Sequence, residues 1–437
     1  MPRPALERLA AAVVVATLAL GLLLAIRRWA VDVPSGDSWE LVPLLAAWRD
    51  GRLGLAGLWP QHNEHRIVFP RLAMLLLATV SGWSALWEIG ANVALAGATL
   101  ALLAVTLRLT VAPRWPTLAR GLTVVAAAFT FSLVQWENWT WGWQMSVFLN
   151  AWAAAAAFAR WPGRWRAFGV AFGAAIVGAF SFASGIVLLW LVPAAFVAQR
   201  GAGVRAAAAT FALAAALTAA YFHGYVSPAG HPSPSLALDH PARAVGYALA
   251  YLGGPLVRGD ETRAAIAYGA LGATVFAVAV AGAWRTVPAA RDVLVPWAFV
   301  AGFVLASAVV SAIGRSGMGT AQALASRYTT ITGLFWIATL ALAALAVASR
   351  GRPTRSVAIA LVALGVALGA GWVRGYAGGV HGFRWRAARL WRGQACLRHY
   401  ATADDACLGL LYPMPLRERA AALEAMRLGP FGPRAGS

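Results

Sequence analysis

The chain has 437 residues, of which 60% are hydrophobic, and a formal net charge of +20. A soluble protein of this balance would expose large apolar patches and aggregate, so the composition excludes an ordinary soluble domain. All of the basic side chains are arginines, and they stand between the apolar runs, which favours a role in membrane topology over nucleic-acid binding.

Long apolar runs fill most of the chain. A bilayer core of about 30 Å needs roughly 20 apolar residues per helical crossing, and these runs are too long and uniform for barrel strands. We therefore predict an all-α polytopic membrane protein with about eleven transmembrane helices, the first of them retained rather than cleaved as a signal peptide. The crossings are expected near 9–29, 86–109, 119–135, 144–160, 166–180, 182–198, 205–222, 264–283, 292–313, 328–348 and 355–374.

Two shorter apolar runs, 67–82 and 244–257, are expected to lie along the interface or to re-enter. If both crossed instead, the 62–66 segment and the 223–242 loop would lie on opposite faces. Arginine-bearing connectors at 108–120, 160–166, 200–205, 285–291 and 350–355 are expected to be cytoplasmic by the positive-inside rule.

This topology divides the chain into two parts. Residues 1–374 are expected to form the transmembrane domain, with a cytoplasmic N-terminus and a first exterior loop at 30–85. Residues 375–437 are expected to form an exterior tail with a short helix from Pro415 to Leu428. In an oxidising exterior, Cys396 and Cys407 are predicted to form a disulfide, with two unrelated buried thiols as the alternative.

Ionisable residues are almost absent from the span interiors and gather in the first exterior loop. Asp37 follows the first helix and could act as a general base; alternatively, Asp37 or Ser38 caps a surface helix that begins near Leu41. Glu40 stands beside them as a candidate substrate-binding residue. Three more candidates for substrate binding follow in the same loop: His62, Glu64 and His65. These three could also hold a divalent metal, although loop histidines more often only form hydrogen bonds.

A tryptophan-rich connector, 135–144, carries Glu137 and Gln144 among its indoles. An interfacial aromatic belt explains the tryptophans alone. Stacked indoles beside a carboxylate and an amide also suit a carbohydrate or a polyprenyl head group, which makes Trp136, Trp139 and Gln144 candidate substrate-binding residues.

A third candidate is Arg327-Tyr328 at the outer mouth of a late span. An arginine there could pair with a lipid phosphate, and the alternative is an arginine that reaches to the interface.

The order of these pieces resembles the first exterior loop of the GT-C superfamily of membrane glycosyltransferases, such as bacterial protein mannosyltransferases and the lipid A aminoarabinose transferase. An acidic residue follows the first helix, then come a surface helix, a loop ending in EHRIVFPRL and an amphipathic helix that closes at Gly82. The turn Phe69–Leu72 lacks the family's double proline. The resemblance covers roughly residues 1–165, with a weaker match at Arg327-Tyr328.

The resemblance implies transfer of a sugar from a polyprenyl-phosphate-linked donor to an acceptor hydroxyl of a glycan, lipid or protein, on the exterior face of a bacterial inner membrane. Asp37 would be the base in a single inverting displacement, and Glu137 would orient the acceptor or assist. Arg327, Tyr328 and Arg66 would bind the donor phosphate. A bound Mg or Mn occurs in some relatives and not in others. The alternatives are a flippase for lipid-linked glycans and a non-catalytic envelope-assembly protein.

Overall fold

The computed structural model describes residues 3–159, 164–200, 203–287 and 289–432, so Arg160 of the expected cytoplasmic connectors lies outside the described residues. Within these ranges the chain is helical, with no strand and one isolated β-bridge between His62 and His65. Eight helices are long and apolar enough to cross a membrane. The architecture therefore agrees with an all-α membrane protein.

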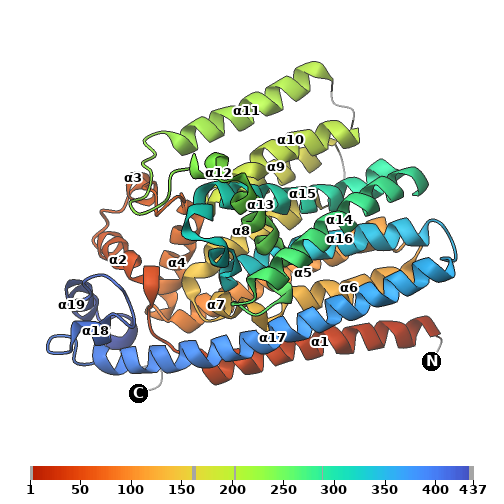
Figure 1. Ribbon diagram of the computed structural model, residues 1–437. Helices are drawn as coiled ribbons and strands as arrows, with labels where there is room; N and C mark the ends of the chain where they lie inside the picture. Colours follow the sequence, from red (N-terminus) through yellow and green to blue (C-terminus); the bar gives the residue numbers. More distant parts are fainter. Residues whose placement is uncertain (1–2, 160–163, 201–202, 288, 433–437) are drawn as a thin grey trace.

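The longer helices form the bundle (Figure 1). They are α1 (Arg3–Trp29), α5 (Ala85–Thr110), α6 (Pro116–Thr130), α8 (Met145–Phe158), α9 (Arg164–Ala179), α10 (Ile186–Arg200), α11 (Val204–Phe222), α14 (Thr262–Thr286), α15 (Ala290–Arg315), α16 (Thr329–Ala348) and α17 (Arg355–Leu397). The shorter ones are α2 (Val42–Arg49), α3 (Leu55–Leu58), α4 (Val68–Ser81), α7 (Trp136–Trp139), α12 (Leu236–Asp239), α13 (Pro241–Gly253), α18 (Asp405–Leu408) and α19 (Arg417–Ala425).

The expected count of about eleven crossings is wrong by the criterion of helix length. The apolar runs assigned to three crossings fold into α8, α9 and α10, which have 14, 16 and 15 residues. At 1.5 Å per residue these helices measure about 21 to 24 Å, less than the bilayer core of about 30 Å. Helix α8 is apolar because it is buried against other helices, not because it faces lipid.

The two runs expected not to span are also short. Helix α4 has 14 residues and ends at Gly82, whose left-handed φ of 63° suits glycine at a helix C-terminus. The second run becomes α13, which has 13 residues and packs against α14 and α15. The surface helix expected near Leu41 is present as α2.

The bundle has one continuous apolar core, with α8 and α16 among its most buried helices. Helix α16 contacts α6, α8, α14 and α15, while α1 and α17 lie along one side of the bundle (Figure 1). The polar segments that join the helices lie at one end of this core.

A second apolar core lies at that end, in what we call the lobe: residues 30–84 together with residues 387–432. Its buried members come from both parts of the sequence, including Trp39 and Leu75 from the first loop and Leu408 and Leu423 from the C-terminal region. Figure 1 shows α2, α4, α18 and α19 gathered there, at the end of the bundle away from the N-terminus. The first loop and the tail, expected to be separate, therefore share one core.

Helix α17 connects the bundle to the lobe. Its 43 residues correspond to a length of about 65 Å, so the expected boundary at residue 374 falls inside a continuous helix. Cys396, in the last turn of α17, forms a disulfide with Cys407 of α18, with their Cα atoms 6.1 Å apart. The short helix expected at 415–428 is present as α19.

Glycines on α17 allow other backbone segments to approach it closely. A Cβ atom at Gly375 would lie 2.7 Å from the Pro255 carbonyl oxygen, and one at Gly379 would overlap the Leu133 carbonyl group. Small residues four apart are what such close packing requires. Gly375 and Gly379 thereby allow the segments 133–136 and 254–257 to pack closely against α17, where these segments form part of the wall of a cavity.

Candidate functional site

The segment before α16 is held to the tryptophan-rich connector by a set of hydrogen bonds. The Ser326 hydroxyl donates to the Val134 carbonyl oxygen at 2.8 Å and accepts from the Glu137 backbone N–H at 3.2 Å. The Asn138 amide donates to the Arg327 carbonyl oxygen at 3.0 Å. Because both backbones are fixed, the side chains of Glu137 and Arg327 meet in a defined geometry.

Glu137 and Arg327 form an ion pair with an N–O distance of 2.9 Å. Both line a cavity of about 310 Å³, the first cavity, whose wall also includes Trp136, Arg258 and Gly378. The guanidinium of Arg327 also lies 5.5 Å from the centroid of the Tyr328 ring. With two guanidinium groups and one carboxylate, this cavity is suited to an anion.

Tyr328, the next residue, lines a second cavity of about 250 Å³ together with Glu64 and Arg315. Arg315 forms an ion pair with Glu64 and donates to the Tyr328 hydroxyl at 2.9 Å. Gln322, which lines the first cavity, donates to the same hydroxyl at 2.9 Å. The two cavities are thus connected through consecutive residues, Arg327 and Tyr328.

Asp37 lies in the lobe. Its carboxylate is 3.2 Å from His62 Nε2, and the His62 ring packs edge-on against Trp143 with centroids 5.0 Å apart. Asp37 is not among the described residues that line either cavity. Helix α2 has Leu41 at its N-cap position, so neither Asp37 nor Ser38 caps it.

The pKa values of Glu64 and His65 are both lowered, which favours the charged form of Glu64 and the neutral form of His65. Burial opposes ionisation of Glu64, but the charges of His65 and Arg315 and the hydrogen bond from Arg315 lower its pKa to about 2. Burial lowers the pKa of His65 to about 4, although Glu64 acts against it. His65 is therefore neutral at pH 7, and its Nδ1 accepts a hydrogen bond from the Ala183 backbone N–H at 3.0 Å.

Several predicted site residues have structural partners. Glu40 pairs with Arg419 at 3.0 Å and accepts a hydrogen bond from Tyr412, which ties η1 (Gly36–Leu41) to the tail. Arg66 donates to the carbonyl oxygens of Trp59, Tyr221 and His223. These bonds use the guanidinium to hold the loop, so phosphate binding by Arg66 remains only a prediction.

The predicted site residues of the tryptophan-rich connector also differ in whether they reach the first cavity. Trp136 lines the first cavity. Trp139 is fully buried in the core, where its indole N–H donates to the Ser132 carbonyl oxygen at 2.9 Å. Gln144 is buried as well. Only Trp136 of these three therefore reaches the first cavity.

Sequence reasoning missed Arg315, Arg258 and Arg386. Arg386 is half-buried and donates to the Ser35 hydroxyl at 2.9 Å. An arginine at the last turn of α15 was the one available signal for Arg315, since such arginines commonly mark span ends. The positions of Arg258 and Arg386 depend on packing between distant segments.

Among the described residues, no three His, Cys, Asp or Glu side chains are grouped in a way that could hold a metal ion. His62, Glu64 and His65 are instead arranged as two pairs, Asp37 with His62 and Glu64 with His65. No family model, curated protein or solved structure matches the chain.

Proposed function

We propose that this chain is a membrane glycosyltransferase that moves a sugar from a polyprenyl-phosphate-linked donor to an acceptor hydroxyl on the exterior face. The observation that supports this most is the first cavity, which presents Arg327 and Arg258 beside Glu137 at the mouth of a span. A lipid-linked phosphate requires positive charge where its head group binds.

In the proposed reaction the acceptor oxygen attacks the anomeric carbon of the donor sugar. Asp37 takes the acceptor proton, and His62, 3.2 Å away, holds the carboxylate in place. The bond between the anomeric carbon and the phosphate oxygen breaks, and the electron pair stays on the phosphate. Arg327 stabilises that developing charge, and one displacement inverts the anomeric centre. Since Asp37 lies outside the first cavity in the described structure, the donor sugar must extend from that cavity toward the lobe.

Glu137 has a second task in this proposal. Without a ligand it neutralises Arg327; with a phosphate bound it can turn to the acceptor, because the phosphate then supplies the negative charge. The proposed steps use only side chains of the chain.

The proposed location is a bacterial inner membrane with the lobe on the exterior side. One observation supports this orientation: the lobe holds a disulfide, and disulfides persist in oxidising compartments.

The test uses the full chain in phosphatidylcholine nanodiscs with farnesyl phosphate and farnesyl-phosphate-linked glucose, mannose, galactose and arabinose. Binding of farnesyl phosphate does not depend on the sugar, and its release from a linked sugar reports transfer. We expect saturable binding that is weakened in Arg327→Gln, and release with at least one sugar. If farnesyl phosphate does not bind to the folded protein, the proposal is wrong.

A further inference from the structure

The second cavity has a polar end with one unsatisfied atom. Glu64 Oε2 is buried and has no hydrogen-bond partner among the described residues, and His231 Nδ1, 4.0 Å away, is beyond hydrogen-bonding distance. The other oxygen of the carboxylate is occupied by Arg315. An ionised carboxylate oxygen can only accept hydrogen bonds, so an occupant that satisfies Glu64 must bring a donor.

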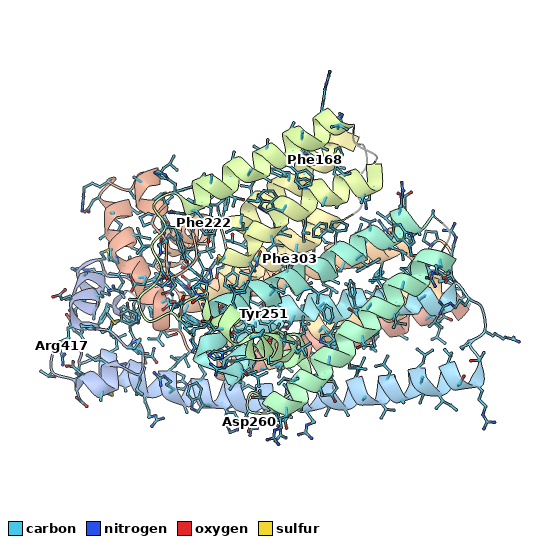
Figure 2. The ribbon with its side chains drawn as sticks, turned by 45° about the horizontal axis from the view of Figure 1, so that its top comes forward. Phe168, Phe222, Tyr251, Asp260, Phe303 and Arg417 are labelled. Atoms are coloured by element: carbon cyan, nitrogen blue, oxygen red, sulfur yellow. A yellow bond between two sulfur atoms is a disulfide. The ribbon has the colours of Figure 1, made fainter. Side chains whose placement is uncertain are left out.

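Other residues that line this cavity are apolar and exposed. Phe222, Val310 and Ile313 line it with 49%, 45% and 44% of their surface exposed. Val310 and Ile313 are three residues apart on α15, and Figure 2 shows Phe222 at the end of α11 nearer the lobe. Both helices are candidate membrane spans, so large apolar side chains exposed on them face lipid. The cavity therefore opens toward the hydrocarbon.

We propose that the second cavity binds an amphiphile whose hydroxylated head group donates to Glu64 and whose apolar chain leaves past Val310 and Ile313 into the bilayer. A phosphate head does not suit it, because the unpartnered atom is an anion and the described lining residues include one guanidinium, Arg315, against two in the first cavity. The low pKa of Glu64 keeps that acceptor ionised over the physiological range.

This inference rests on the proposed function in one respect: if the chain is a glycosyltransferase, the occupant of the second cavity is the acceptor of the transferred sugar. The chain would then glycosylate a lipid that carries a hydroxyl. Donor and acceptor would bind in separate cavities that share the Arg327-Tyr328 segment, with the phosphate at Arg327 and the hydroxylated head beyond Tyr328.

The test is photolabelling in nanodiscs without any donor. The probe is dodecyl glucoside with a diazirine in its chain, compared with diazirine-bearing dodecyl phosphate and dodecylamine at equal concentration. We expect the glucoside to label peptides that contain Phe222, Val310 or Ile313, and to do so in preference to the other two. Preferential labelling by the phosphate or by the amine would overturn the assignment of a hydroxylated head.

Two variants make the result specific to the cavity. Val310→Trp fills the apolar exit and should lower glucoside labelling at least about tenfold, which corresponds to about 1.4 kcal/mol of binding. Val309→Trp is the matched control, because Val309 is 53% exposed and does not line the cavity. Equal labelling of the two variants contradicts the inference. The photolabelling assay needs no turnover and no donor, so its outcome does not depend on whether farnesyl phosphate binds at Arg327.

Discussion

The backbone N–H of Gly36 donates a hydrogen bond of 2.6 Å to the carbonyl oxygen of Leu411. This bond joins the turn just before Asp37 to the segment that follows the disulfide-linked helix α18. Arg386 reinforces it through the Ser35 hydroxyl. The C-terminal region thus fixes the backbone on which the proposed base stands.

Replacing Gly36 by alanine should therefore disturb both stability and activity. Gly36 has a left-handed φ of 54°, and an added Cβ would lie 2.6 Å from the Trp141 ring. The backbone conformation alone costs an alanine about 1 kcal/mol or more. We expect Gly36→Ala to lower the thermal midpoint in nanodiscs and to reduce sugar transfer, while farnesyl phosphate binding at Arg327 stays unchanged.

Gly51→Ala is the control for that variant. Gly51 lies in the same loop with a φ of 66°, but a Cβ there would meet no atom within 4 Å. It should show the modest loss of stability and normal transfer. If both variants transfer sugar equally well, the turn before Asp37 has no special role.

The disulfide should be necessary for the lobe. Cys396 and Cys407 are 11 residues apart, and closing a loop of this length contributes on the order of 2–3 kcal/mol. We expect the Cys396→Ser, Cys407→Ser double variant to unfold at a lower temperature. On intact cells, a membrane-impermeant maleimide should label the wild-type thiols only after reduction.

Ala406→Ser serves as the control, since Ala406 is exposed beside Cys407 and takes no part in the bond. Labelling that requires permeabilised cells would place the lobe on the cytoplasmic side and reverse the proposed orientation.

Local signals were sufficient to predict the surface helices of the first loop. The end of α4 at Gly82 follows from one residue that tolerates a left-handed backbone. The number of crossings could not be obtained in this way, because apolar runs buried inside a bundle look like runs that face lipid. Short turns around 136–144 and 181–185 shortened three of those runs.

The site was predictable as a set of residue types but not as a set of contacts. Glu137 and Arg327 were both singled out, yet their pairing across 190 residues of sequence depends on the bonds of Ser326 and Asn138. The pairing of Arg315 with Glu64 and the lobe's shared core depend on tertiary packing alone. For Glu40 and Arg66 the sequence predicted contacts with substrate or phosphate. The structure shows contacts of these side chains that hold the first loop in place.

Asp37→Asn should separate the proposed enzyme from the alternative functions. The substitution removes the base but keeps the size of the side chain, so we expect transfer to fall by about 10² to 10⁴ with the fold and donor binding intact. Release of farnesyl phosphate measures the loss. A flippase or an envelope-assembly protein should be indifferent to this change.

Asp50→Asn is the matched control. Asp50 is an exposed carboxylate in the same loop and pairs only with Arg52 at the surface, so its loss should leave transfer unchanged. Normal transfer by Asp37→Asn would show that another group acts as the base.

Arg327→Gln should weaken binding of farnesyl phosphate by about 10- to 100-fold. A hydrogen bond to a charged group contributes about 1.5–3 kcal/mol, and each 1.4 kcal/mol is about tenfold in affinity. Isothermal titration in nanodiscs gives the constant directly. Arg263→Gln, at an exposed arginine of α14 outside the first cavity, should bind as the wild type does. Equal affinities for the two variants would remove Arg327 from the phosphate site.

The pair Glu64 and His65 makes stability depend on pH. His65 has a pKa of about 4 in the folded chain against 6.5 for the free side chain, so between these values the unfolded chain binds more protons and acid favours unfolding. Relative to His65→Gln, the wild type should therefore lose stability as the pH falls from 6.5 toward 4, by a free energy of order 3 kcal/mol at most, and the difference between the two should be constant above about pH 7.

His65→Gln should flatten that decline, because glutamine can accept from the Ala183 N–H but does not titrate. His399→Gln, at an exposed histidine, should keep the full decline. Glu64 reinforces the trend at lower pH: its pKa of about 2 lies below its ordinary 4.5, so its contribution is present above pH 4.5 and is lost as the pH falls toward 2. Parallel pH profiles of the wild type and His65→Gln between pH 7 and 4 would show that His65 is not buried in its neutral form.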